Sequence, residues 1–115
     1  MGWNTFALQI NIMFDFIKKI FGIKTIDYSA LRKSGAIIVD VRTKAEFAGG
    51  HIQGAINIPL NTIQQNLKLL KDKNQPIITC CASGMRSATA KSILKNLGYN
   101  QVYNGGGWYG LKNKL

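Results

Sequence analysis

Short apolar runs rich in isoleucine and valine recur along this chain at residues 37–41, 55–58, 77–79 and 102–103. β-Branched residues favour extended backbone, so each run predicts a strand. The run at 37–41 is apolar at successive positions before Asp40, which is typical of a strand covered on both faces. We therefore expect this strand near the centre of a sheet.

Most of the segments between these runs carry apolar residues three and four positions apart, the spacing of one helix face. The predicted helices span residues 29–33, 43–49, 61–73 and 86–97. Thr43 and Glu46 match a capping box, in which each side chain accepts a hydrogen bond from the other residue's backbone N–H. Strands that alternate with helices predict an α/β fold, with a central, mostly parallel sheet and helices on both faces.

The first part of the chain, residues 1–23, is interpreted as a separate extension. Its apolar residues predict an amphipathic helix over residues 10–21 that ends at Gly22. A basic start and a small-residue cleavage site are missing, so we do not expect export, and we expect a cytoplasmic protein. Two roles stay open for this helix: packing on the following domain, or contact with a membrane surface or a partner protein, which would make the protein membrane-peripheral.

The rest of the chain, residues 24–115, is predicted to form one domain. A chain of 115 residues with 46% apolar composition can build a single core without disulfide or metal support, and we expect a monomer. Cys80 and Cys81 are adjacent, a spacing that suits neither an ordinary disulfide nor a metal site, and His51 is the only histidine. We therefore expect a reducing compartment, no bound metal and no cofactor.

A formal net charge of +10, from 15 basic and 5 acidic residues, is spread along the chain. No basic stripe is interleaved with aromatic residues, so the pattern indicates a lysine-rich solvated surface rather than nucleic-acid binding. The positive field would still speed the capture of a small anion, an effect that salt weakens.

Candidate chemistry is concentrated in residues 81–87, Cys-Ala-Ser-Gly-Met-Arg-Ser, which join an apolar strand to a helix. Gly84 permits backbone angles that other residues avoid, and the N–H groups that begin the helix point into the loop, so this segment can cradle an anion. The helix dipole and Arg86 both favour thiolate over thiol at Cys81. We predict that Cys81 has a lowered pKa and acts as a nucleophile.

Two separated motifs carry a family resemblance. The first comprises Asp-Val-Arg at 40–42, Glu-Phe at 46–47, Gly-His-Ile-Gln-Gly-Ala at 50–55 and Asn-Ile-Pro at 57–59. The second is the cysteine loop at 81–87. In this order and spacing the motifs resemble those of the single-domain rhodaneses, the thiosulfate sulfurtransferase family, over residues 24–115.

The resemblance implies a rhodanese-like fold and an enzyme that moves sulfane sulfur from thiosulfate, or a related persulfide donor, through a Cys81 persulfide to cyanide or a thiol acceptor. It places substrate-binding residues in the loop and after the central strand: Ala82, Ser83, Gly84, Met85, Arg86 and Arg42. Backbone N–H groups of the loop would hold the persulfide anion as an oxyanion hole does. Double-displacement kinetics are expected.

Several polar residues near the motifs have more than one interpretation. Arg86 is expected to clamp the sulfonate end of the donor, and a surface salt bridge is the alternative. Arg42 is expected near the site, although a structural pairing with Glu46 or Asp40 explains it equally well. Asp40 is interpreted as a hydrogen-bonding post and His51 as a hydrogen-bonded structural histidine.

Two other functions compete with sulfur transfer. Phosphatases and arsenate reductases also use a cysteine in an anion loop, and five residues separate Cys80 from Arg86, as in tyrosine phosphatases. Gly84 is then misplaced, and no aspartate lies in a recognisable general-acid loop, which disfavours phosphoryl transfer. The other alternative is a rhodanese-like binding module without catalysis, but such modules usually lack the loop cysteine.

Overall fold

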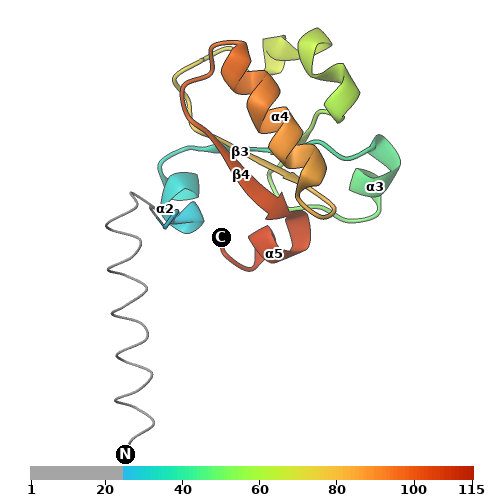
Figure 1. Ribbon diagram of the computed structural model, residues 1–115. Helices are drawn as coiled ribbons and strands as arrows, with labels where there is room; N and C mark the ends of the chain where they lie inside the picture. The colour runs from blue at the N-terminus through green and yellow to red at the C-terminus, as the bar shows by residue number, and fades with distance from the viewer. Residues whose placement is uncertain (1–24) are drawn as a thin grey trace, which may run out of the picture.

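The computed structural model describes residues 25–115, which form a parallel sheet with helices around it (Figure 1). The four strands are β1 (Ile37–Asp40), β2 (Ile56–Asn57), β3 (Ile77–Cys81) and β4 (Val102–Gly107). Their order is β2-β1-β3-β4, and every neighbouring pair is parallel. This sheet confirms the predicted fold class and the inner position of the strand at 37–40. The predicted amphipathic helix at 10–21 lies outside the described residues.

Two apolar cores lie on opposite faces of the sheet. On one face, α4 (Met85–Asn96) packs through Ala90 and Leu94 beside the 3₁₀ turn η1 (Leu60–Gln65). On the other face, α2 (Tyr28–Lys33) and α5 (Trp108–Lys112) cover Ile38 and Ile78. A sheet covered on both faces explains why its inner strands are apolar at successive positions.

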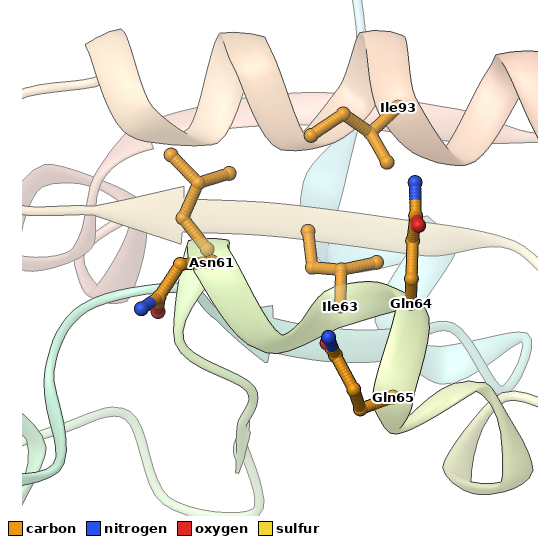
Figure 2. Close-up of a pocket in the computed structure, with 6 residues that line it drawn as sticks. Asn61, Ile63, Gln64, Gln65 and Ile93 are labelled. Atoms are coloured by element: carbon orange, nitrogen blue, oxygen red, sulfur yellow. The ribbon is translucent and has the colours of Figure 1, made fainter.

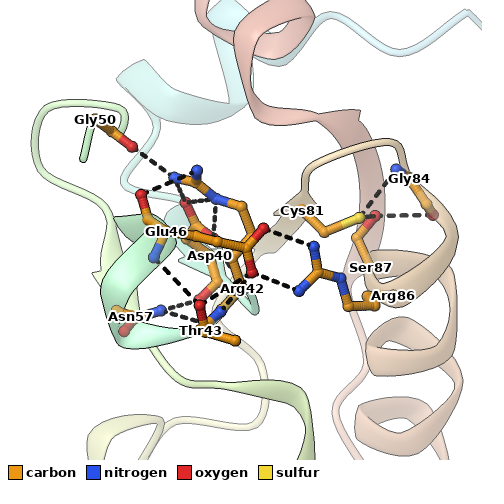
Figure 3. A network of polar contacts seen from close by, with 10 residues as sticks. All are labelled: Asp40, Arg42, Thr43, Glu46, Gly50, Asn57, Cys81, Gly84, Arg86 and Ser87. Carbon is orange, nitrogen blue, oxygen red and sulfur yellow. Dashed lines mark hydrogen bonds and ion pairs between the residues drawn. The ribbon is translucent and has the colours of Figure 1, made fainter. Parts of the chain in front are cut away.

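Thr43 caps α3 (Lys44–Ala48) in the way the sequence predicts. Its side chain accepts a hydrogen bond from the backbone N–H of Glu46, and Glu46 accepts one from the backbone N–H of Thr43. This reciprocal pair confirms the capping box. It also directs the Glu46 carboxylate to the end of α3 that faces the β3–α4 junction, as Figure 3 shows.

The predicted helix over residues 61–73 is wrong. The chain there forms two 3₁₀ turns, η1 and η2 (Leu67–Leu69), separated by Asn66, whose backbone angles of φ −121° and ψ 22° are not helical. Thr62 donates its hydroxyl to the carbonyl of Pro59, and the Asn66 side chain donates to the carbonyl of Thr62. Such local side-chain hydrogen bonds compete with α-helical ones, so the apolar spacing alone misleads here.

The chain after residue 102 is more regular than the sequence indicates. Strand β4 continues through three glycines to Gly107, and α5 follows directly. Within residues 25–115, no helix has both the length and the apolar character needed to cross a membrane.

Candidate active site

The junction between β3 and α4 holds the candidate nucleophile. Cys81 is the last residue of β3, and a three-residue link of Ala82, Ser83 and Gly84 leads into α4. Gly84 has φ +104°, a left-handed conformation that a side chain would strain. This turn lets the Gly84 N–H point back at the end of the strand, where it donates to Cys81 Sγ.

Glycines at the end of β4 allow this loop to lie flat against the sheet. A Cβ atom added to Gly107 would come within 2.9 Å of the Ala82 carbonyl oxygen, and one added to Gly84 would come within 3.3 Å of the Gly106 Cα. Gly107 also stands opposite Cys81 in the β3–β4 register. The loop and the strand beneath it are therefore in backbone contact, which holds the cysteine loop in one shape.

Local donors surround the sulfur atom of Cys81. The backbone N–H of Gly84 donates to Sγ at 2.9 Å, and Ser87 Oγ lies 3.5 Å from Sγ (Figure 3). Burial raises the pKa of the Cys81 thiol, but hydrogen bonds from Ser87 and from the backbone of Gly84 and Ser83 more than offset this, so the pKa lies below its ordinary value. The direction of this pKa shift agrees with the prediction, and hydrogen bonds from neighbouring groups produce it.

Ser87 is a site residue whose role the sequence does not reveal. Its side chain is completely buried, and its hydroxyl lies 3.0 Å from the Gly84 carbonyl and 2.6 Å from Asn104 Oδ1. Thr79 donates its own hydroxyl to the Ser87 carbonyl at 2.9 Å, which fastens the first turn of α4 to β3. A serine two residues into a helix carries no pattern that would separate this role from ordinary helix packing.

Cys80 points away from the loop. It belongs to the core on the α5 side of the sheet, whereas Cys81 belongs to the core on the α4 side. Burial and the nearby Asp40 carboxylate raise the pKa of the Cys80 thiol to about 12. The alternation of side chains along a strand thus separates a protonated cysteine from the one that faces the anion loop.

Arg86 forms an ion pair across the front of the site. Its two terminal nitrogens donate to the two carboxylate oxygens of Glu46 at 2.8 and 2.9 Å, and both side chains are about one third exposed (Figure 3). The Arg86 guanidinium and the backbone N–H of Thr43 lower the pKa of Glu46 to about 2. Arg86 is therefore held at the loop by a residue forty positions away, while its remaining N–H groups stay unused by this pair.

Arg42 is buried and engaged by other groups. Its guanidinium donates to both carboxylate oxygens of Asp40, with a closest distance of 2.7 Å, and to the carbonyls of Gly50 and Glu46. It also lies 4.6 Å from the centre of the Trp108 ring. Of the two interpretations that the sequence leaves open, these contacts favour the structural pairing, and Asp40 serves as the expected hydrogen-bonding post.

His51 and Phe47 close the turn that follows α3. The two rings stack with centroids 3.7 Å apart, and His51 Nδ1 lies 2.7 Å from the Phe47 carbonyl oxygen. The described contacts therefore agree with a hydrogen-bonded structural histidine. Because the ring is exposed, the contact is local to this turn.

Two hollows lie on the α4 side of the sheet, and one of them reaches the loop at Arg86. One, of about 300 Å³, is lined by Val41, Thr43, Pro59, Leu60, Asn61 and Arg86. The other, of about 290 Å³, lies between η1 and α4, where Asn61, Gln64 and Gln65 surround Ile63 and Ile93 (Figure 2). Leu60 and Asn61 line both hollows, and Arg86 lines the first.

Comparisons with known proteins place this geometry in a family. A family model described as the rhodanese-like domain matches residues 26–114. The thiosulfate sulfurtransferase PspE of Escherichia coli (strain K12) is 40% identical over 70 residues, which cover 60% of this chain and 67% of that protein. The thiosulfate sulfurtransferase GlpE of Stutzerimonas stutzeri (strain A1501) is 35% identical over 75 residues, or 65% of this chain and 68% of that one.

A solved structure shares the fold. It is described as a rhodanese with anions from E. coli, and it superposes with a TM-score of 0.62 at 36% sequence identity. The match covers 66% of this chain and 91% of the other. The sequence comparison and the structural comparison therefore identify the same family.

Proposed function

This chain belongs to the rhodanese-like domain family, and on that premise we propose that it is a sulfurtransferase that moves sulfane sulfur from thiosulfate, or a related persulfide donor, through Cys81 to cyanide or a thiol. The observation that carries the proposal is the position of Cys81 Sγ, which accepts the Gly84 N–H at 2.9 Å in a loop that lowers its pKa. A thiolate in such a loop is a nucleophile at neutral pH.

The first half-reaction loads the sulfur. The Cys81 thiolate attacks the outer sulfur of thiosulfate, a new S–S bond forms, and the S–S bond of thiosulfate breaks with its electron pair leaving on sulfite. The product is a Cys81 persulfide anion. Backbone N–H groups of the loop would hold this anion. The Gly84 N–H, which donates to Sγ at 2.9 Å, and the backbone hydrogen bonds of Ser83 and Ser87 support this role.

The second half-reaction transfers the sulfur to the acceptor and regenerates the Cys81 thiolate. Cyanide attacks the outer sulfur of the persulfide, and the Cys81 thiolate leaves as thiocyanate forms; a thiolate acceptor would form a persulfide in the same way. No proton moves in either step once Cys81 is ionised. A general base is therefore not needed, which agrees with Asp40 being fully occupied by Arg42.

Arg86 is the residue we assign to the donor's sulfonate group. It lines the hollow of about 300 Å³ beside the loop, and its guanidinium keeps N–H groups beyond those used by Glu46. A planar donor group suits a tetrahedral oxyanion. The contacts of Arg42 give no support to its predicted role in substrate binding. We propose instead that Arg42 stabilises the site through its buried pairing with Asp40.

The position of Cys80 disfavours the phosphatase alternative. It requires Cys80 as the nucleophile, and Cys80 is completely buried on the opposite face of the sheet with a pKa of about 12. The binding-module alternative does not explain why the loop keeps a cysteine whose pKa is lowered by surrounding donors.

The test is a thiosulfate:cyanide assay that measures thiocyanate, run beside hydrolysis of an aryl phosphate. The proposal expects thiocyanate formation with double-displacement kinetics in the wild type and in Cys80→Ala, and none in Cys81→Ser. Phosphate release that depends on Cys80 would overturn it. Absence of thiocyanate from the folded wild type would instead support the binding module.

A further inference from the structure

Asn104 lies on β4 beneath the cysteine loop and contacts it with both ends of its amide. Its Oδ1 lies 2.6 Å from Ser87 Oγ and accepts the Gly106 backbone N–H at 2.9 Å. Its Nδ2 donates to the Gly84 carbonyl at 3.3 Å. The backbone carbonyl of Asn104 accepts the hydroxyl of Tyr28, which ties the same residue to α2. One side chain thus joins the loop, the helix that follows it and the glycine segment beneath.

These contacts fix which end of the amide faces Ser87. The Gly106 N–H can only donate, and the Gly84 carbonyl can only accept, so the amide oxygen must lie toward Gly106 and the amide nitrogen toward Gly84. Ser87 therefore meets an acceptor at Asn104, and in a hydrogen bond between the two Ser87 is the donor. The orientation follows from two backbone partners and does not depend on the state of Cys81.

The Ser87 hydroxyl has one proton and three neighbours that can accept it: Asn104 Oδ1 at 2.6 Å, the Gly84 carbonyl at 3.0 Å and Cys81 Sγ at 3.5 Å. When Cys81 is a thiol, its S–H donates to Ser87 Oγ at 3.5 Å, and the Ser87 proton goes to Asn104 Oδ1. When Cys81 is a thiolate, the Ser87 proton turns to Sγ, and Asn104 Oδ1 keeps only the Gly106 N–H. Asn104 and the thiolate therefore compete for the same proton.

We propose that Asn104 is a positioning residue that sets, through the Ser87 hydroxyl, the balance between the thiol and the thiolate of Cys81. This role rests on the proposed function, because it concerns the same nucleophile. While Cys81 is a thiol, Asn104 holds the Ser87 proton and so disfavours ionisation of the thiol. It also holds the Ser87 side chain in a position from which rotation of the hydroxyl about its C–O bond brings the O–H to Sγ.

Other ionisable groups around Cys81 stand apart from this relay. Cys80 on β3 and Arg86 on α4 lie close enough to Cys81 for their charges to interact. Glu46 on α3 pairs with Arg86, Asp40 on β1 pairs with Arg42, and the Tyr28 hydroxyl on α2 contacts the Asn104 backbone carbonyl. Among the contacts of residues 25–115, none joins the Asn104 side chain to a charged group. A substitution at Asn104 thus leaves these groups paired as they are.

The experiment measures the rate of Cys81 alkylation by iodoacetamide against pH in the full chain. Asn104→Leu removes the nearer of the two oxygen acceptors that compete with Sγ and leaves the Gly84 carbonyl in place. The midpoint should therefore move to lower pH by at most about one unit, the size of one hydrogen bond to a charged group. Asn104→Asp keeps the shape but adds a negative charge and a stronger acceptor, so the midpoint should move to higher pH. The added charge raises the Asn104→Asp midpoint by repulsion even without a relay. The part of each shift that depends on Ser87 therefore decides the test.

Ser87→Ala supplies the control, because it removes the group through which Asn104 is said to act. In that background the Asn104→Leu shift should vanish and the Asn104→Asp shift should shrink. Shifts that persist undiminished without the Ser87 hydroxyl would overturn the proposal. If Asn104→Leu does not fold, as judged by circular dichroism, the aspartate pair decides alone. Alkylation needs no sulfur donor, so a failed thiosulfate assay would refute the proposed function and leave this result intact.

Discussion

Replacing Asp40 by asparagine tests whether Arg42 is part of the core rather than of the substrate-binding set. Asp40 is 0% exposed and Arg42 is 4% exposed, and the guanidinium makes its shortest contact, 2.7 Å, with the Asp40 carboxylate. Asparagine keeps the shape of aspartate but removes the negative charge. It also places an N–H₂ donor where one carboxylate oxygen accepts from Arg42.

The expected cost is large for a domain of this size. Removing one partner of a buried ion pair leaves an uncompensated charge and typically costs about 3–5 kcal/mol. The carbonyls of Gly50 and Glu46 and the Trp108 ring still contact Arg42, so we expect the lower end, about 3 kcal/mol. Because small domains are stable by only about 5–15 kcal/mol, this loss is easily measured.

Urea unfolding followed by circular dichroism gives the free energy of unfolding and its slope against urea. Asp72→Asn is the matched control, because Asp72 is exposed and contacts only the Asn74 N–H, so its cost should stay within about 0.5 kcal/mol. Adding Arg42→Met to Asp40→Asn should recover part of the loss, since no buried charge then remains. A loss below about 1 kcal/mol, or no recovery in the double variant, would refute the structural role of this pair.

Three further outcomes follow from the site. Arg86→Ala should raise the KM for thiosulfate and spare alkylation of the Cys81 thiol, whereas unchanged kinetics would show that Arg86 does not contact the donor. Glu46→Gln should free Arg86 from its anchor and raise the same KM less than Arg86→Ala does, and an equal or larger increase would show that Glu46 has another role. The pKa of Glu46 is lowered to about 2, so the stability that its ion pair contributes is present above the ordinary pKa of a glutamate and is lost as the pH falls toward 2. The wild type should therefore lose stability over this pH range relative to Glu46→Gln. Identical acid unfolding of the two proteins would show that the pair contributes nothing.

Local patterns in the sequence were sufficient for much of the fold. The capping box of Thr43 and Glu46 depends on residues three positions apart, and the strand before Cys81 is recognisable from its β-branched run. The opposite environments of Cys80 and Cys81 follow from the alternation of a strand. Each of these inferences needs only neighbours along the chain.

Contacts between distant residues could not be inferred in the same way. The Glu46–Arg86 pair spans forty positions, and the Ser87–Asn104 contact spans seventeen. The loop also packs closely on Gly106 and Gly107 of β4. Nothing in the spacing of these residues indicates which partner each one meets. The 3₁₀ turns at 60–69 were missed because local hydrogen bonds of Thr62 and Asn66 outweigh the apolar spacing.

The most direct test of sulfur transfer through Cys81 is the intact mass of the protein after thiosulfate treatment and removal of excess donor. We predict one added sulfur atom in the wild type and in Cys80→Ala, lost again on addition of cyanide, and no added sulfur in Cys81→Ser. Cys81→Ser changes one atom of a side chain whose neighbours stay in place, so the fold should be retained. An adduct that persists in Cys81→Ser, or that disappears in Cys80→Ala, would contradict the assignment of the nucleophile.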